Sequence, residues 1–331
     1  MKAPQWIVVV GASAGGVESL RQLFGALRAD SDAVFLVVLH IPAHSPSQLD
    51  RVLSTVTAMP VSSPKDNEPL KRGHVYVGSA DLHLLVEDGV IRQTRGPKEC
   101  RARPAIDVLF RSAAAIYGPR TIGVVLSGML DDGTAGLWTI KDRGGKALVQ
   151  DPKEAMHAPM PESAIQHVEV DRVARCAELA AEIGEITSGP APATVERDGG
   201  RIAVENRIAS EGNALQLGVM DMGKVSQYTC PDCHGVLVQI EEGPVVRFRC
   251  HTGHAFSLQT LLAELSDSID KGLWDAIRSI EERVLLLRQT SELVPEPRDA
   301  ASLRKLAEDA EASIKPLKEL VLDVRLFGRQ R

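Results

Sequence analysis

The feature of this sequence that most constrains its fold is an apolar run that leads into a glycine-rich turn near the N-terminus. Residues 6–10 read WIVVV and residues 11–16 read GASAGG. Apolar side chains then recur at the spacing of one helix face, at Val17, Leu20, Leu23, Phe24 and Leu27. A buried strand that enters a helix through such a turn is typical of a parallel sheet covered by helices.

The same alternation of strand and helix continues to about Thr187. Four more short apolar runs predict strands, at residues 34–39, 74–77, 122–126 and 147–150. Apolar residues over 106–113 keep a helical period after Pro104, a residue type that favours the first turn of a helix. These patterns predict a doubly wound, mostly parallel α/β domain over residues 1–187.

Three further segments follow the predicted sheet domain. Residues 188–225 are rich in Pro, Gly and charge and keep no steady apolar period, so we expect a linker there. Residues 226–258 form a short Cys-rich module of β type. Apolar stripes over residues 259–331, interrupted by the VPEP turn, predict a helical hairpin whose second helix is kinked at Pro316.

Charge and hydropathy exclude several classes of protein. The formal net charge is −6, whereas binding to a phosphate backbone needs clustered Lys and Arg, so we expect no nucleic-acid partner. The apolar run at residues 6–10 is too short for a signal peptide or a membrane span. We therefore expect a cytoplasmic protein with no membrane insertion.

The glycine-rich turn presents Ser13 at the end of the first predicted strand. Such a turn suits a bound phosphate or a reactive serine, because the helix that follows offers free N–H groups. A dinucleotide fingerprint would need glycine in place of Ser13, and a phosphate-binding loop would need a Gly-Lys-Ser/Thr ending. The match to Gly-x-Ser-x-Gly indicates a nucleophile elbow, although α/β-hydrolases place that elbow in mid-chain and order their triad Ser, acid, His. From the turn alone, a serine that only caps the helix is an equal alternative.

A serine nucleophile needs a base to accept its proton and an acid to orient that base. His40 ends the second predicted strand, with His44 as the alternative base, and the loop after the fourth predicted strand carries Asp131 and Asp132. Each of these residues alone would be an ordinary surface or turn residue. Because the carboxyl ends of parallel strands meet at one edge of a sheet, their convergence with Ser13 favours a catalytic triad.

Five motifs together carry a resemblance to a known family: GASAGG, LHIP, RPAIDVLF, LSGMLDDGTAG and PMPESAI. In combination and order they resemble the catalytic domain of CheB-type chemotaxis methylesterases, over about residues 5–187. The resemblance implies Ser13 as nucleophile, His40 as base and Asp132 as the third member of the triad.

The resemblance also implies an active-site rim formed by Ala14, Met129 and Arg103. Ala14 stands where many members have Thr, which leaves backbone N–H groups as the donors to an oxyanion. Asp131 stands where the family often has Asn, so no catalytic role is implied for its carboxylate.

The implied reaction is hydrolysis of a γ-glutamyl methyl ester on a methylated chemoreceptor or receptor-like protein, through an acyl-enzyme on Ser13. Deamidation of glutamine is a second implied activity, and a separate signalling regulator is a further candidate partner. Regulated members carry a receiver domain ahead of the esterase. Because twelve residues precede Ser13, we expect no receiver in this chain.

Two paired ligand steps predict a metal site in the Cys-rich module: Cys230-x2-Cys233 and Cys250-x3-His254. Thiolates and imidazole at this spacing favour tetrahedral zinc, and four protein ligands leave no open position for chemistry. We therefore expect a structural zinc and no cofactor in catalysis, with His251 as the alternative to His254. The segment RCHTGHAFS resembles extensions that follow some methylesterase domains without a receiver.

Two other functions stay open from the sequence. One is a non-catalytic scaffold, in which the metal module and the tail recruit partners in a chemotaxis-like system. The other is a serine hydrolase that acts on a small ester. The tail itself is explained by amphipathic packing or self-association, with docking to a receptor or regulator as the alternative.

Overall fold

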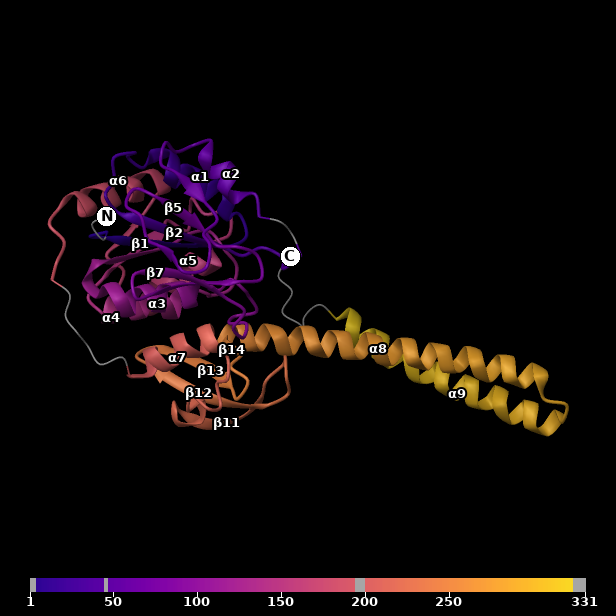
Figure 1. The fold of residues 1–331 in the computed structure, drawn as a ribbon. Coiled ribbons are helices and arrows are strands. Elements are labelled where there is room, and N and C mark those ends of the chain that lie inside the picture. The colour runs from indigo at the N-terminus through magenta and orange to yellow at the C-terminus, as the bar shows by residue number, and fades with distance from the viewer. Residues whose placement is uncertain (1–3, 45–46, 194–199, 324–331) are drawn as a thin grey trace. The chain divides into compact units, whose positions relative to one another are not determined.

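The computed structural model describes residues 4–44, 47–193 and 200–323 (Figure 1). The chain divides into two compact units, Met1–Thr260 and Leu261–Arg331. The first unit holds every residue of the predicted triad and metal site.

A seven-stranded parallel sheet forms the centre of the first unit. Its strands lie in the order β10-β9-β8-β1-β2-β5-β3, with bounds β1 Ile7–Ala12, β2 Val34–Leu39, β3 Val61–Ser62, β5 Val75–Val77, β8 Thr121–Val125, β9 Lys146–Gln150 and β10 Arg172–Ala174. Each pairing in the sheet is parallel. The five strands predicted from the sequence are confirmed as β1, β2, β5, β8 and β9, whereas β3 and β10 are too short to give a sequence signal.

Helices cover both faces of this sheet, as the sequence predicts for a doubly wound fold (Figure 1). One face packs against α1 Gly16–Ala26, α2 Leu49–Ser54 and α6 Cys176–Ser188, and the other packs against α3 Ile106–Tyr117, α4 Thr134–Asp142 and α5 Pro159–His167. Alternate residues of β1 pack into the cores on the two faces of the sheet, because successive side chains of a strand point in opposite directions. A small antiparallel sheet of β4 Glu68–Pro69, β7 Val90–Thr94 and β6 His83–Glu87 flanks this core.

The order of the strands creates a switch point beside β1. Strand β2 pairs with one edge of β1, and β8, which comes much later in the chain, pairs with the other edge. Loops diverge at such a point and leave a crevice at the carboxyl ends of the strands. The turn after β1 and the loop after β8 both open onto this crevice.

The interval 188–225 differs from the expected linker. It contains helix α7 Gly200–Glu211 and a short 3-10 helix, Val219–Asp221. The buried face of α7 includes a charged residue, Glu205, beside Ile208 and Ala209, so no apolar stripe marks the helix in the sequence. Residues 194–199 of the expected linker lie outside the described residues.

A four-stranded antiparallel sheet follows α7 and completes the first unit. Its order is β11-β12-β13-β14, with bounds β11 Lys224–Thr229, β12 Val236–Glu242, β13 Val245–Cys250 and β14 Ala255–Ser257. Contacts between α7 and α3 join this part of the chain to the parallel-sheet domain. The metal module is thus part of the same compact unit as the predicted triad.

The helical C-terminal region is present as predicted. It consists of α8 Leu258–Leu293 and α9 Pro297–Leu322, and α9 continues through Pro316. Ile277, Ile314 and Val321 form the buried stripe between the two helices. Ion pairs Arg288–Glu311 and Lys318–Glu281 join their exposed faces. None of the helices among the described residues is long and apolar enough to cross a membrane.

Candidate active site

The turn after β1 presents Ser13 at the crevice. The Ser13 N–H donates to the Ser127 carbonyl at 2.9 Å, and the Gly16 N–H donates to the Ser13 carbonyl at 2.9 Å. Gly15 adopts φ 73°, and a Cβ there would meet Met156 Cβ at 2.7 Å. Only glycine fits both the backbone angle and the space, so the turn that exposes Ser13 requires glycine at position 15 of the GASAGG sequence.

His40 lies between Ser13 and Asp132. Its Nδ1 is 3.2 Å from Ser13 Oγ, and its Nε2 is 2.8 Å from Asp132 Oδ2. Because a carboxylate only accepts hydrogen bonds, Nε2–H donates to Asp132, and Nδ1 is left to accept the Ser13 hydroxyl proton. The three residues that the sequence predicts for the triad are therefore joined in one hydrogen-bonded chain, through the opposite ring nitrogens from those of the chymotrypsin arrangement.

The N-terminus of α3 holds the Asp132 carboxylate in place. Oδ2 accepts from the Ile106 N–H at 2.7 Å and Oδ1 accepts from the Asp107 N–H at 3.0 Å. With His40, three N–H donors surround a carboxylate that is 2% exposed. Helix N-terminal N–H groups favour negative charge, so this end of α3 fixes both the position and the acceptor role of Asp132.

Asp107 belongs to the site although the sequence analysis assigned it no role. Its Oδ1 accepts from the Gly133 and Gly136 N–H groups at 3.0 and 2.6 Å, so it ties the start of α4 to α3. Burial, followed by the neighbouring Asp132 carboxylate, raises the pKa of Asp107 to about 8. A neutral Asp107 avoids placing a second negative charge beside Asp132. An acid in the first turn of a predicted helix was the available signal.

An open cavity of about 480 Å³ lies over this hydrogen-bonded chain. Its lining includes Met129 and Arg103, two of the expected rim residues, while Ala14 is not among the lining residues. The Arg103 guanidinium is engaged by Asp81 Oδ1 at 2.9 Å and by the Gly96 carbonyl at 2.8 Å. Hydrogen bonding to Arg103 lowers the pKa of Asp81. Arg103 therefore shapes the rim through Asp81 and the backbone.

Residues far along the chain also reach the site. Thr260 lines the cavity, and the Ser257 hydroxyl donates to Asp131 Oδ1 at 2.6 Å. Burial raises the pKa of Asp131 to about 6. Neither Ser257 nor Thr260 has a sequence signal that links it to the site, because the contact arises only when β14 packs against the loop after β8.

The four predicted metal ligands lie together in the four-stranded module. The side-chain ligand atoms of Cys230, Cys233, Cys250 and His254 are all within 4.8 Å of one another. Cys250 Sγ is 3.6 Å from Cys233 Sγ and 3.7 Å from His254 Nδ1. These separations fit a tetrahedral metal, for which thiolate bonds of about 2.3 Å give edges of about 3.8 Å. The set can bind a metal ion.

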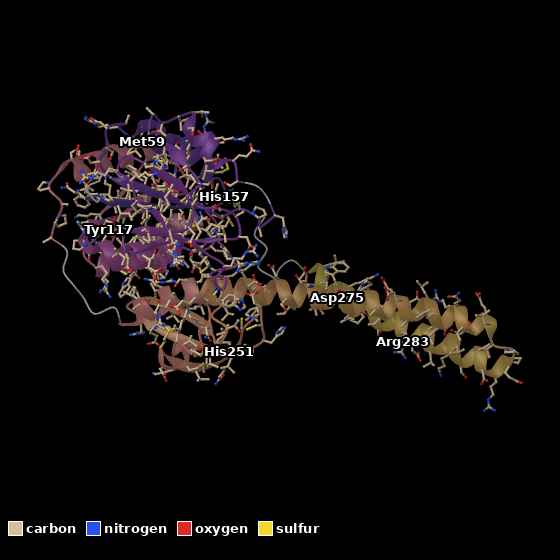
Figure 2. The ribbon with its side chains drawn as sticks, viewed as in Figure 1. Met59, Tyr117, His157, His251, Asp275 and Arg283 are labelled. Carbon is tan, nitrogen blue, oxygen red and sulfur yellow. The ribbon has the colours of Figure 1, made fainter. Side chains whose placement is uncertain are left out.

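The other cysteines and the alternative histidine lie apart from this cluster. His251 is exposed on the same module, where Figure 2 labels it, and is not one of the grouped ligands. Cys100 and Cys176 are both buried, and burial raises the pKa of each thiol. Both are thus protonated and poorly nucleophilic at neutral pH.

A parallel α/β sheet that carries a Ser–His–Asp hydrogen-bonded chain at its strand ends has the architecture of a serine hydrolase. A family model of the CheB methylesterase matches residues 8–183. The chain belongs to the CheB methylesterase family.

Known relatives and a solved structure agree with this placement. The chain is 38% identical over 167 residues to a Leptospira interrogans protein provisionally named protein-glutamate methylesterase/protein-glutamine glutaminase, covering 50% of this chain and 86% of that protein. It is 35% identical over 177 residues to protein-glutamate methylesterase/protein-glutamine glutaminase 1 of Geobacter metallireducens, covering 52% of this chain and 48% of the relative. The crystal structure of the Thermotoga maritima CheB methylesterase catalytic domain superposes with a TM-score of 0.53 at 31% identity, covering 55% of this chain and 98% of that chain.

Proposed function

We propose that this chain is a protein-glutamate methylesterase that hydrolyses γ-glutamyl methyl esters on chemoreceptor-like proteins, with Ser13, His40 and Asp132 as its catalytic triad. The observation that carries the proposal is the hydrogen-bonded chain from Asp132 through His40 to Ser13 beneath an open cavity. The family of the chain and the names of its relatives support the same substrate class. The proposal includes a cytoplasmic enzyme that acts on a chemoreceptor-like helix.

The first half of the proposed reaction forms an acyl-enzyme. Ser13 Oγ attacks the ester carbonyl carbon while its proton passes to His40 Nδ1, and Asp132 stabilises the imidazolium that results. The backbone N–H groups of Ala14 and Gly15 hold the oxyanion, since those of Ser13 and Gly16 donate to the Ser127 and Ser13 carbonyls. As the tetrahedral intermediate collapses, the C–O bond to the methoxy group breaks, and that oxygen takes the proton from His40 and leaves as methanol.

The second half releases the product. Water gives a proton to His40 Nδ1 and attacks the acyl carbon, and collapse of this intermediate breaks the bond to Ser13 Oγ, which recovers the proton. The product is a free glutamate side chain. A glutamine side chain follows the same steps with ammonia as the leaving group, which accounts for a second, deamidase activity.

The experiment that tests this proposal measures methanol release from membranes that carry methylated receptors. We expect methanol to be released by the full chain, and a fluorophosphonate probe to label it at Ser13. Ser54→Ala is the matched control, because Ser54 is an exposed α2 hydroxyl bonded to the Asp50 carbonyl of its own helix. It should label and hydrolyse like the wild type.

The same measurements separate the two alternative functions. A non-catalytic scaffold would show neither labelling nor methanol release. A serine hydrolase specific for a small ester would be labelled at Ser13 and would hydrolyse that ester, but it would release no methanol from receptor membranes. Labelling together with methanol release supports the methylesterase.

We also propose that the Cys230, Cys233, Cys250 and His254 cluster binds a structural zinc, in a module of zinc-ribbon type. The chemistry of three thiols and one imidazole within 4.8 Å supports this metal over a hard cation that prefers oxygen. Zinc holds the module together without an open position for substrate. Elemental analysis of purified protein should find about one zinc per chain, and a metal-free protein with an ordered module would contradict the proposal.

A further inference from the structure

A loop at the rim of the cavity carries several cations and one acid. Residues 95–103 read RGPKECRAR, and Lys98, Arg101 and Arg103 line the cavity. The one acid in this loop, Glu99, is not among the lining residues and is 2% exposed. The rim loop, residues 95–103, therefore places three cationic side chains at the cavity, of which Arg103 is paired with Asp81, and it buries its one acid.

Two buried arginines hold Glu99. Arg111 of α3 places its Nη2 atom at 2.9 and 2.8 Å from the two carboxylate oxygens. Arg249 of β13 places its Nη2 atom at 2.8 Å from Oε1. One arginine thus comes from the parallel-sheet domain and the other from the four-stranded module, so Glu99 joins the two. Charge-assisted hydrogen bonds between buried groups hold their partners in a defined geometry.

Backbone hydrogen bonds hold the same loop from the module side. The Cys100 N–H donates to the Ala255 carbonyl at 2.9 Å, and the Ala255 N–H donates to the Lys98 carbonyl at 3.1 Å. Cys100 and Arg101 adopt positive φ angles of 47° and 69°. Side chains other than glycine keep such angles only where the surrounding structure enforces them. The pairing with Ala255 supplies that constraint.

The residues that hold the rim loop adjoin the metal ligands. Arg249 precedes Cys250, and Ala255 follows His254. Between them, the Arg249 guanidinium donates to the Gly253 carbonyl at 2.9 Å, and the Cys250 N–H donates to the His254 carbonyl at 3.0 Å. The turn that supplies two of the four ligands is the same turn that contacts the rim loop.

We infer that the module of residues 224–257 positions the active-site rim: metal held by Cys250 and His254 orders Arg249 and Ala255, and these hold the rim loop in the conformation that binds protein substrate. The substrate part of this inference rests on the proposed methylesterase function. Metal at the cysteine cluster therefore controls substrate binding across the unit, while the chemistry stays with Ser13, His40 and Asp132.

The first test measures hydrogen exchange in the full chain, with zinc bound and after removal of zinc by a chelator. The Cys100 amide should exchange about tenfold or more faster without metal, because its hydrogen bond to Ala255 opens more often. Amides of β1, the central strand of the parallel sheet, serve as the internal control and should keep their protection. Unchanged exchange at Cys100 in metal-free protein would overturn the inference.

The second test compares two conservative variants of one strand. Arg249→Lys shortens the side chain that reaches Glu99, whereas Arg247→Lys alters a buried arginine that contacts Glu205 and Glu242 but not Glu99. For methylated receptor membranes, Arg249→Lys should raise KM by about tenfold with kcat nearly unchanged, as expected when one charge-assisted contact is lost. Arg247→Lys should leave KM within about twofold of the wild type.

Equal KM values for the two variants would overturn the inference, as would a fall in kcat alone. Circular dichroism and zinc content establish that each variant is folded and loaded. The exchange test needs no substrate, so it still decides whether the module holds the rim loop if methanol release fails and the proposed function falls.

Discussion

The cavity around Ser13 and the cysteine cluster are assembled in opposite ways. Ser13 and Asp132 meet His40 across 27 and 92 residues of sequence, and each side chain stands at the end of a different strand of the parallel sheet. The cysteine cluster draws its ligands from two tight turns within Cys230–His254. The proposed hydrolytic centre therefore depends on the whole sheet, whereas the proposed metal centre depends on a short hairpin.

The largest expected effect is a loss of activity at Ser13 that leaves the cysteine cluster unchanged. Ser13→Ala should lower ester hydrolysis by roughly three to six orders of magnitude, because it removes the proposed nucleophile and leaves the packing intact. Zinc content and melting temperature should stay at wild-type values. Rates of methanol release measure the first effect, and activity near that of the wild type would rule out the triad.

The next effect comes from truncation. A chain that ends at residue 190 loses Glu205, Arg249 and Ala209, which contact Arg111, Glu99 and Thr94 of the parallel-sheet domain. Breaking buried ion pairs costs about 3–5 kcal/mol, so the free energy of unfolding should fall by about that amount. Denaturant titration measures it.

A chain that ends at Thr260 is the matched control for that truncation. It keeps every contact within the first unit and removes only residues of the second unit. Its rate on a small ester and its unfolding midpoint should match those of the full chain. If the two truncated chains were equally stable, residues 191–260 would contribute nothing to the stability of the sheet domain.

A smaller effect tests the charge of Asp131, which lies in the loop after β8 and accepts a hydrogen bond from Ser257 of β14. Burial, more than the adjacent Asp132, raises the pKa of Asp131 from 3.8 to about 6. Between about pH 4 and 6 the unfolded chain is ionised there while the folded chain keeps its proton, so stability falls as pH rises through this window, by about 3 kcal/mol.

Asp131→Asn should remove this dependence and raise the stability at pH 7.5, because the amide oxygen still accepts from Ser257. Unfolding titrations at several pH values measure it. Asp275→Asn, on the exposed surface of α8 (Figure 2), is the control and should keep the wild-type slope. The same slope in Asp131→Asn and the wild type would show that Asp131 is not the titrating group.

The smallest effect concerns the Ser257 hydroxyl. Ser257→Ala removes one hydrogen bond to Asp131 and should cost about 1–2 kcal/mol at pH 7.5, where Asp131 is ionised. The loss should shrink below pH 5, where Asp131 is protonated. Ser188→Ala, which alters an exposed hydroxyl bonded within α6, should change stability by less than about 0.5 kcal/mol. A loss of stability that does not vary with pH would show that Ser257 does not act through its hydrogen bond to the Asp131 carboxylate.

Strong local patterns predicted most of the fold. The strands β1, β2, β5, β8 and β9 are rich in apolar residues, and α1 and α3 have clear apolar faces, so their hydrophobic patterns identify them in the sequence. Helix α7 gave no such signal, because its buried face carries Glu205. The negative charge of Glu205 is balanced only when Arg247 and Arg249 form ion pairs with it in the folded chain. In a sequence, a charged residue is expected at the surface, and only the structure shows the partners that allow it to be buried.

The sequence by itself determined the chemistry that each centre can offer and the strand ends that carry it. Ser13, His40 and Asp132 follow apolar strands, and parallel strands place their carboxyl ends at one edge. Only the tertiary structure decided which ring nitrogen of His40 meets each partner, that the N-terminus of α3 holds the Asp132 carboxylate, and that Glu99 binds Arg249. These contacts join segments up to 150 residues apart, and no local pattern encodes them, because their energy exists only once the surrounding water has been excluded.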